Sequence, residues 1–215
     1  MTSKSNIANI RREYSLQSLL ESDMAQTPFL QFQKWWDQAL SSEITDVNAM
    51  TLATCNKDGK PDARIVLLKE FNEEGFTFFT NYNSRKGKEL EENPYACIVF
   101  FWKELERQVR IQGSVKRISS GDSDEYFVQR PKGSRISAWS SPQSDVITSR
   151  EILEENVSRY EQQFGDGNIP RPPYWGGYNL SPTVVEFWQG RSNRLHDRIQ
   201  YTLIDSRWVI ERLAP

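Results

Sequence analysis

The sequence predicts a mainly β protein with flanking helices, an α+β chain whose strands form an antiparallel barrel. Short apolar or alternating runs recur along the chain between hairpin-type turns, and closing such strands into a barrel removes their exposed edges. Strands and helices do not alternate regularly, which argues against a parallel doubly wound sheet. The 215 residues include 7 Trp, 8 Tyr and 11 Phe, so the chain can bury a sizeable core without disulfide bonds.

The amino-terminal part of the chain is polar and then becomes helical. Residues 1–25 are expected to form a flexible arm, and residues 26–215 a single domain. In the stretch TPFLQFQKWWDQAL, Thr27 is the expected N-cap and Pro28 occupies the favoured first helical position. The apolar side chains at helical spacing are Phe29, Phe32, Trp36 and Leu40.

The remaining elements follow from alternation, turn residues and helix-breaking residues. The first hairpin turn contains Asp58 and Gly59. In the last predicted helix, Thr148 and Glu151 have the spacing of a capping box, and Gly165 marks the end. The predicted strands cover residues 49–55, 63–71, 75–81, 95–102, 107–118, 183–188, 198–204 and 207–212. The predicted helices after the first cover residues 84–93, 122–130 and 148–164.

The charge is nearly balanced overall but uneven along the chain. There are 27 basic and 29 acidic residues, a formal net charge of −2, whereas a dedicated nucleic-acid binder is normally more basic. Local basic clusters in a nearly neutral chain favour discrete small anions over a long polyanion. The basic clusters lie at residues 85–88, 107–117, 130–135 and 191–198.

Several classes of protein and site fit the sequence poorly. The apolar run at 96–102 is far too short to span a bilayer, and the first 15 residues have no apolar signal core. Cys55 and Cys97 are expected to be free thiols, so we expect a soluble cytoplasmic protein, with organelle targeting left open by the basic, hydroxyl-bearing amino terminus. One histidine and two distant cysteines argue against a zinc site. There is no glycine-rich phosphate loop and no nucleophile elbow.

The helix predicted at 84–93 begins with a charge pattern that suggests a bound anion. Ser84 is a suitable N-cap, but Arg85 and Lys86 follow in the first turn, where cations oppose the helix dipole by roughly 0.3–1 kcal/mol each. An anion at the helix start would reverse that penalty. The alternative is a solvated charged turn.

Two predicted strands carry polar side chains that could face ligands. Arg64 and Lys69 lie five positions apart, so in one regular strand they would face opposite sides and serve two different anions, unless one is plain surface. Alternation places Gln108, Arg110 and Gln112 on one face of the strand at 107–118. That face either meets water or lines a polar ligand groove.

A third candidate anion site follows the helix predicted at 122–130. Tyr126, Arg130 and Ser134 are spaced by four, but Pro131 and Gly133 are expected to break the helix. We therefore expect a helix end wrapped around an anion, with hydroxyl and guanidinium groups as phosphate ligands. The alternative is an ordinary helix end with a basic residue.

The segment RSNRLHDR holds the only histidine of the chain, His196. It lies close in sequence to Arg191, Arg194 and Arg198. Such a crowd of cations repels itself unless an anion lies nearby. Taken together, the candidate sites predict a protein that binds phosphorylated small molecules through Arg, Lys and hydroxyl groups.

Nine segments of the chain then resemble those of a known family, in the expected order. The segments are RIVLLK, FFTNYNSRKGKEL, FFWKELERQVRIQG, YFVQRPKGSRISAW, SPQSDVI, WGGY, EFWQG, RLHDR and ERLAP. From about Arg11 to Pro215 the chain resembles the pyridoxamine (pyridoxine) 5'-phosphate oxidase family. Asp145 departs from the family pattern, where a serine is also familiar, but it touches no expected catalytic role.

The resemblance implies a fold, a cofactor and a reaction. The fold would be a split β-barrel that binds FMN non-covalently, and the protein a homodimer with two FMN molecules at the subunit interface. The enzyme would oxidise pyridoxamine or pyridoxine 5'-phosphate to pyridoxal 5'-phosphate, a step of vitamin B6 salvage. Dioxygen would be the acceptor, hydrogen peroxide a product, and ammonia would leave from the amine.

The resemblance also implies roles for particular residues. Arg194 and His196 would be catalytic and frame the substrate ring beside Leu195. The expected substrate-phosphate ligands are Lys69, Tyr126, Arg130 and Ser134, and the segment that can close over the substrate is Arg11, Arg12, Glu13 and Tyr14. The expected FMN contacts are Arg64, Ile65, Val66, Leu67, Phe79, Thr80, Arg85, Lys86, Gln108, Gln143, Ser144, Trp188 and Arg198.

Two other functions stay open at the level of sequence. One is a flavin reductase or another split-barrel oxidoreductase with a different substrate, against which the phosphate ligands at 126–134 argue. The other is a non-catalytic binder of pyridoxal phosphate or of RNA, although the negative net charge argues against RNA.

Overall fold

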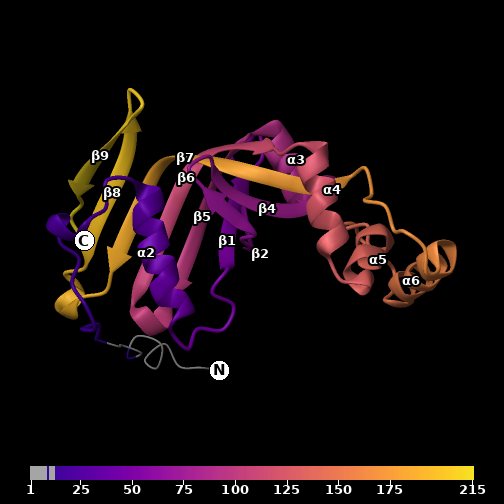
Figure 1. The fold of residues 1–215 in the computed structure, drawn as a ribbon, viewed down its shortest axis with the longest axis horizontal. Helices are drawn as coiled ribbons and strands as arrows, with labels where there is room; N and C mark the ends of the chain where they lie inside the picture. The colour runs from indigo at the N-terminus through magenta and orange to yellow at the C-terminus, as the bar shows by residue number, and fades with distance from the viewer. Residues whose placement is uncertain (1–8, 10–12) are drawn as a thin grey trace. The chain divides into compact units, whose positions relative to one another are not determined.

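The computed structural model describes Asn9 and residues 13–215 (Figure 1). Arg11 and Arg12, two expected substrate contacts, lie outside the described residues. The chain divides into two compact units. The first unit comprises the described residues of Met1–Val47 together with Val99–Ile111 and Thr183–Pro215, and the second unit comprises Asn48–Ile98 and Gln112–Pro182. Three strands contribute residues to both units: β5 (Tyr95–Trp102), β6 (Arg107–Arg117) and β7 (Trp175–Gln189).

The second unit contains a seven-membered run of the sheet, in the order β2-β1-β5-β6-β7-β4-β3. β1 pairs antiparallel with β2, and β4 pairs antiparallel with β3 and β7. Gly59 has a φ of 76° in the turn between β1 and β2, so the predicted hairpin is confirmed. The further strands of this unit are β1 (Ala49–Cys55), β2 (Pro61–Leu67), β3 (Glu70–Asn72) and β4 (Gly75–Asn81).

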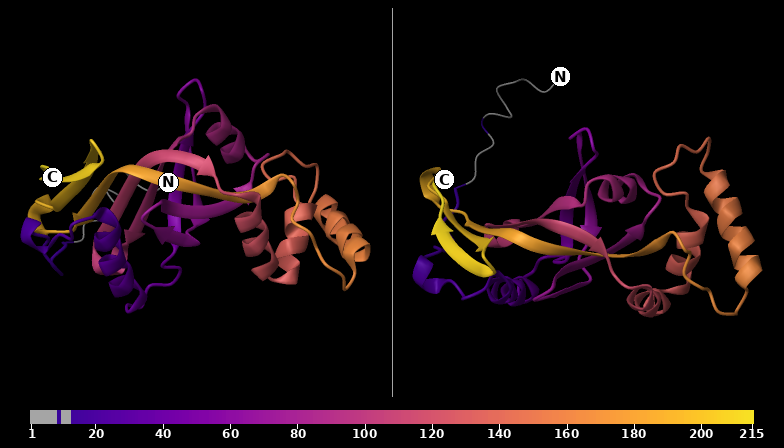
Figure 2. Two further views of the ribbon diagram at one scale, coloured as in Figure 1. Left: turned by 45° about the horizontal axis from the view of Figure 1, so that its top comes forward. Right: turned by 90° about the horizontal axis from the view of Figure 1, so that it is seen from above.

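Four helices belong to the second unit and supply part of its core. α5 and α6 pack side by side (Figures 1 and 2). The ring centroids of Trp139 and Tyr160 lie 5.6 Å apart between them. Phe127 and Ile136 are fully buried against Trp175 in the same cluster. The helices are α3 (Arg85–Glu92), α4 (Ser120–Gln129), α5 (Lys132–Ser140) and α6 (Glu151–Phe164). This packing fixes α4 and α5, which carry the expected phosphate ligands Tyr126 and Ser134 and flank a third, Arg130.

In the first unit the strand order is β5-β6-β7-β8-β9, and the β8–β9 hairpin is yellow in Figure 2. Thr27 caps α2 by accepting a hydrogen bond from the Leu30 N–H, as predicted. Phe32 of α2 packs against Phe100, with ring centroids 5.2 Å apart. The new elements are α2 (Pro28–Leu40), β8 (Asp197–Ile204), β9 (Arg207–Arg212) and the 3-10 turns Glu21–Asp23, Lys103–Leu105 and Ser192–Arg194.

The predicted class, mainly β and antiparallel with flanking helices, is confirmed, but several boundaries were wrong. The run at 63–71 forms two strands, because the chain leaves the β1 pairing after Leu67 and β3 begins only at Glu70. β7 begins at Trp175 rather than at residue 183. Residues 132–140 form α5, which the sequence did not predict.

Two local helix predictions were also wrong. Thr148 does not cap α6, because the helix begins at Glu151 and its N-cap position, Arg150, makes no side-chain capping bond. The buried face of α2 includes Trp35 and Ala39, whereas Leu40 is 58% exposed. Within the part of the chain that the structure describes, no helix combines the length and the apolar character needed to cross a bilayer.

Candidate functional site

A cavity of about 610 Å³ in the second unit is lined by four cationic side chains and, among the described residues, by no carboxylate. Its size is typical of ligand-binding cavities, and its charge favours an anion. The four cations are Arg64, Lys69, Lys86 and Arg130. The other lining residues are Ile65, Val66, Leu67, Phe79, Thr80, Tyr126, Gln129, Pro131, Ser134, Gln143 and Trp175.

Arg64 projects from β2, and its guanidinium group forms ion pairs with two carboxylates that do not line the cavity. Its Nη2 lies 2.7 Å from Asp62 Oδ2 and 3.3 Å from Glu89 Oε2, and its Nη1 donates to Thr54 Oγ1. Burial alone would raise the pKa of Glu89, but hydrogen bonds from Thr54, Arg85 and Arg64 outweigh it and lower that pKa. The guanidinium of Arg64 is therefore fixed in orientation where it meets the cavity.

The two cations at the start of α3 have different surroundings. Ser84 caps the helix by accepting from the Gly87 N–H, as predicted. Arg85 does not line the cavity; its Nε lies 3.0 Å from Glu89 Oε1 and 3.1 Å from Asp62 Oδ2. With Ser144 it instead lines a separate hollow of about 360 Å³. Of the two residues, only Lys86 faces the cavity.

Lys86 is 8% exposed, and its ammonium group donates to three neutral oxygen atoms. Its Nζ lies 3.0 Å from Gln143 Oε1, 3.2 Å from Thr80 Oγ1 and 3.3 Å from Ser84 Oγ. Burial, with repulsion from Arg64 second, lowers the pKa of Lys86 to about 8. Asp62 and Glu89 attract this ammonium group electrostatically, but burial and Arg64 outweigh them, and an anion in the cavity would add the negative charge that keeps Lys86 protonated.

The aromatic wall of the cavity carries the fourth cation. Tyr126 stacks on Phe79 with ring centroids 3.9 Å apart, and Phe79 stacks on Trp175 at 5.4 Å. The Arg130 guanidinium lies 4.5 Å from the Trp175 ring centroid. Its Nη1 is buried without a hydrogen-bond partner among the described residues, and burial lowers the Arg130 pKa. Such an unsatisfied donor is costly unless a ligand accepts from it.

The structure thus brings together twelve of the expected second-unit contacts and adds Gln129, Pro131 and Trp175, to which the sequence assigned no role. The WGGY segment was a signal for Trp175, but nothing local showed that its ring would reach Arg130. The break between β2 and β3 explains why Arg64 and Lys69 line one cavity although they are five positions apart. Alternation holds only while a strand continues.

The expected contacts of the first unit form a separate group around His196. The His196 ring lies 4.6 Å from that of Trp188 and 5.9 Å from that of Tyr14. Its Nδ1 accepts a hydrogen bond from the Arg191 N–H at 3.1 Å, so the neutral ring carries its proton on Nε2. Burial, with repulsion from Arg194 second, lowers the His196 pKa. The ring is therefore a neutral donor near pH 7.

Arg194 and Arg198 differ in how they are held. Arg194 is exposed and has a φ of 61°, following Asn193 at 56°, and Leu195 is 69% exposed. Arg198 donates to both carboxylate oxygens of Glu186, at 2.9 and 3.1 Å. Gln108 lies on the half-buried face of β6, which confirms the predicted alternation.

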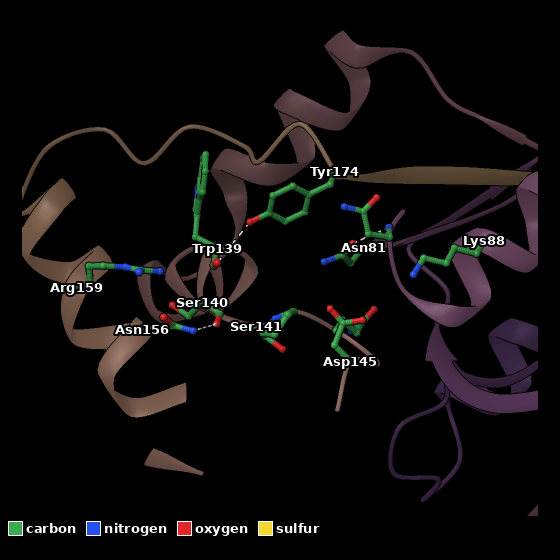
Figure 3. Close-up of a pocket in the computed structure, with 12 residues that line it drawn as sticks. Asn81, Lys88, Trp139, Ser140, Ser141, Asp145, Asn156, Arg159 and Tyr174 are labelled. Carbon is green, nitrogen blue, oxygen red and sulfur yellow. Dashed lines mark hydrogen bonds between the residues drawn. The ribbon is translucent and has the colours of Figure 1, made fainter. Parts of the chain in front are cut away.

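A second cavity of about 450 Å³ also belongs to the second unit and is shown in Figure 3. Asn156 Nδ2 donates to the Ser140 carbonyl at 3.0 Å, and the Tyr174 hydroxyl donates to the Trp139 carbonyl at 3.4 Å. Among the residues that line it, Gln143 alone is an expected cofactor contact. This cavity is therefore distinct from the cationic one, although the two share that side chain.

Residues 36–164 match a family model described as pyridoxamine 5'-phosphate oxidase. The chain belongs to the pyridoxamine 5'-phosphate oxidase family. Residues 175–215 match a second model, described as the pyridoxine 5'-phosphate oxidase C-terminal dimerisation region. Family membership confirms the resemblance drawn from the nine segments.

Curated relatives of the same family cover nearly the whole chain. A protein of Cyanothece sp. named pyridoxine/pyridoxamine 5'-phosphate oxidase is 58% identical over 210 residues, 98% of this chain and 99% of the relative. One of the same name from Nostoc punctiforme is 55% identical over 97% of this chain and 98% of its own length.

Solved structures of similar fold confirm the split-barrel class. PhzG from Burkholderia lata, solved in complex with tetrahydrophenazine-1-carboxylic acid, superposes with a TM-score of 0.88 at 28% identity, covering 94% of this chain and 100% of that chain. A pyridoxamine 5'-phosphate oxidase-related, FMN-binding protein of Nostoc punctiforme superposes at 0.70 with 20% identity, covering 89% and 100% of the two chains. At 20% identity the second likeness concerns the fold alone.

Proposed function

We propose that the protein is an FMN-dependent oxidase that converts pyridoxamine 5'-phosphate and pyridoxine 5'-phosphate to pyridoxal 5'-phosphate. In the amine reaction, the CH–NH2 group is oxidised to an aldehyde whose oxygen comes from water. Ammonia leaves, and the two electrons reduce dioxygen to hydrogen peroxide. The family and the names of the relatives support this proposal. The observation that carries it is the cavity with four cations and no carboxylate among its described lining residues, because both the cofactor and the substrate bear a phosphate.

The donor set around Lys86 fits the phosphate of FMN. Arg64, Lys86, Thr80 and Gln143 offer guanidinium, ammonium, hydroxyl and amide groups to one cavity, and the Lys86 ammonium is hydrogen-bonded to the neutral Thr80 and Gln143 side chains. The bound flavin supplies the redox chemistry by accepting a hydride equivalent from the substrate carbon that bears the amine or alcohol. Arg64 and Lys86 would hold its phosphate, and residues 65–67, which line the same cavity, would contact the cofactor.

The second group of donors fits the substrate phosphate. Lys69, Tyr126, Arg130 and Ser134 line the same cavity, and the buried Nη1 of Arg130 is a donor ready for a phosphate oxygen. Charge-assisted hydrogen bonds of this kind contribute about 1.5–3 kcal/mol each. These residues bind and orient the substrate and so position its reactive carbon. They take no part in the redox step themselves.

The group around His196 completes the site from the dimer partner. Trp188, Arg194, His196 and Arg198 lie within residues 175–215, the segment that matches a dimerisation region. We therefore propose a homodimer with FMN at the subunit interface, in which His196 and Arg194 meet the substrate ring. The neutral His196 ring would donate from Nε2 to a polar substituent of the substrate ring, and Gln108, Trp188 and Arg198 would contact the flavin.

A spectrum of the purified protein tests the proposal. We expect the yellow absorbance of a flavin, which bleaches when pyridoxamine 5'-phosphate is added without oxygen. The absorbance should return when oxygen is admitted, and hydrogen peroxide should then be released. A colourless protein that cannot be loaded with FMN would contradict the proposal. Bleaching by a tetrahydrophenazine carboxylate but not by either B6 phosphate would favour an oxidase with another substrate, as the likeness to PhzG allows.

A further inference from the structure

The backbone just after Tyr14 is fastened to a single buried carboxylate in the first unit. The N–H groups of Ser15 and Leu16 both donate to Glu106 Oε2, at 2.8 and 3.0 Å. Glu106 is 2% exposed. Two charge-assisted bonds on one buried oxygen hold a backbone segment more firmly than neutral acceptors would.

Glu106 is itself fixed in place by its own backbone. It has a left-handed φ of 54°, and its carbonyl accepts from the Gly190 N–H at 2.8 Å and from Gln189 Nε2 at 3.2 Å. The backbone at Gly190 lies directly against Tyr14, because a Cβ added there would approach Tyr14 Cβ and Cγ to 2.7 Å. Glu106 and Gly190 therefore define where the chain at Tyr14 can lie.

The position of Tyr14 affects two residues with expected ligand contacts, Trp188 and His196, because its ring packs against both. Its ring meets that of Trp188 edge-on at 5.7 Å and that of His196 at 5.9 Å. A shift of the backbone at residues 15–16 would move the Tyr14 ring relative to both. The contacts form one continuous path from the Glu106 carboxylate to the imidazole.

We propose that Glu106 is a positioning residue for substrate binding, which acts by holding Tyr14 against His196 and Trp188; this inference rests on the proposed function. Glu106 does not touch substrate or cofactor in this role. Its loss leaves other anchors of the same segment in place, such as the Leu19 N–H on Asp197 Oδ2 at 3.0 Å. The effect is therefore local to Tyr14 and its two ring neighbours.

Glu106→Gln in the FMN-loaded enzyme tests the inference, with Glu104→Gln as the matched control. Glu104 is exposed, and its Oε1 lies 3.5 Å from Nζ of the neighbouring Lys103. We expect KM for pyridoxamine 5'-phosphate to rise about three- to tenfold in the first variant, with a smaller change in kcat and an unchanged FMN dissociation constant. The control keeps wild-type values. An equal loss of FMN affinity would indicate general damage and overturn the inference.

Two further variants separate positioning from a structural role. Gly190→Ala keeps the Glu106 carboxylate but places a Cβ 2.7 Å from Tyr14 Cβ and Cγ and 3.1 Å from Glu106 Cβ, so it displaces Tyr14 by crowding, and it should raise KM similarly. In a Tyr14→Ala background, Glu106→Gln should add no further effect on KM, because the residue it acts through is gone. Independent, multiplying effects in the double variant would overturn the inference.

Amide hydrogen exchange supplies a readout that does not depend on catalysis. In Glu106→Gln, exchange at Ser15 and Leu16 should accelerate, while Leu19 keeps its protection. Faster exchange with an unchanged KM would overturn the positioning role and leave the proposed function standing. A wild-type protein whose Ser15 and Leu16 amides are protected from exchange, but which oxidises neither B6 phosphate, would overturn the proposed function and the inference that rests on it.

Discussion

Lys86 places a positive charge where burial disfavours it. Its hydrogen bonds go to an amide and two hydroxyl oxygens, and burial lowers its pKa to about 8. Retaining a buried ammonium with neutral partners is costly, so such a residue commonly marks a functional site. The sequence indicated an anion here because Lys86 opposes the dipole of α3, but it could not show that Arg85 is neutralised by Asp62 and Glu89.

The affinity for FMN should fall as the pH rises above about 8, the pKa of Lys86 in the unliganded protein. Only the ammonium form pairs with the phosphate, and the bound anion raises that pKa, so binding takes up a proton in this range. Flavin fluorescence quenching from pH 7 to 10 measures the dissociation constant. Lys86→Met should weaken binding about ten- to a hundredfold at pH 7 and flatten the profile, whereas Lys86→Arg should keep the affinity at pH 9.

Lys69→Ala tests the second phosphate. Removing one charge-assisted contact of roughly 1.5–3 kcal/mol should raise KM for pyridoxamine 5'-phosphate about ten- to a hundredfold, with FMN retained. Lys60→Ala in the exposed turn between β1 and β2 is the matched control. Steady-state kinetics decide the matter, and an unchanged KM for Lys69→Ala would remove this residue from the site.

Elements were predictable wherever their signals were local. The strands β1, β4, β5 and β9 and the caps at Thr27 and Ser84 follow from alternation and short-range hydrogen bonding. The sequence analysis missed α5 because it took Pro131 only as the end of the preceding helix. Proline is also tolerated at the start of a helix, and Pro131 occupies the N-cap position of α5. The first half of β7 was missed because Gly176, Gly177 and Pro182 are residues of low strand propensity. The strand forms there through its pairing with β4, which is distant in sequence.

A pair of glycine substitutions tests the packing of β6 against β7 in the second unit. A Cβ at Gly113 would approach the Ser181 carbonyl oxygen to 2.0 Å, so Gly113→Ala must push two strands apart at a cost of about 1–3 kcal/mol. Gly133 in α5 has nothing within 4 Å of an added Cβ, and Gly133→Ala should stabilise by up to about 1 kcal/mol. Thermal denaturation of both proteins measures the difference, and equal midpoints would contradict this packing.

At the scale of the whole molecule, the sequence predicted the fold class and the chemistry of the ligands better than the assembly of the site. Local basic clusters in a chain of net charge −2 indicated small anions, and the family and cavity agree with that. The convergence of Lys69 and Arg130 could not be derived from spacing, because it depends on how β2, α4 and α5 pack. The same holds for Glu106, whose partners lie 90 and 91 positions away.

Mixed dimers test the proposed sharing of the site between subunits. Arg130→Ala and Arg194→Ala each remove one substrate contact, from residues of different units. If each site takes these residues from different subunits, random mixing should restore about a quarter of wild-type activity, because half of the dimers are hybrids with one intact site. Assays at low substrate concentration after co-refolding measure this. Activity no higher than that of the parent dimers would mean that both residues serve the same subunit's site.

The stack of Phe79, Tyr126 and Trp175 beneath the Arg130 guanidinium gives the cavity an optical probe of its own. Charge brought close to an indole alters its emission, so inorganic phosphate, which is colourless and cannot be oxidised, should change the tryptophan signal as it fills the cavity. Occupancy can then be followed without turnover, oxygen or bound flavin. Replacing Trp175 by Phe identifies the reporter among the seven tryptophans.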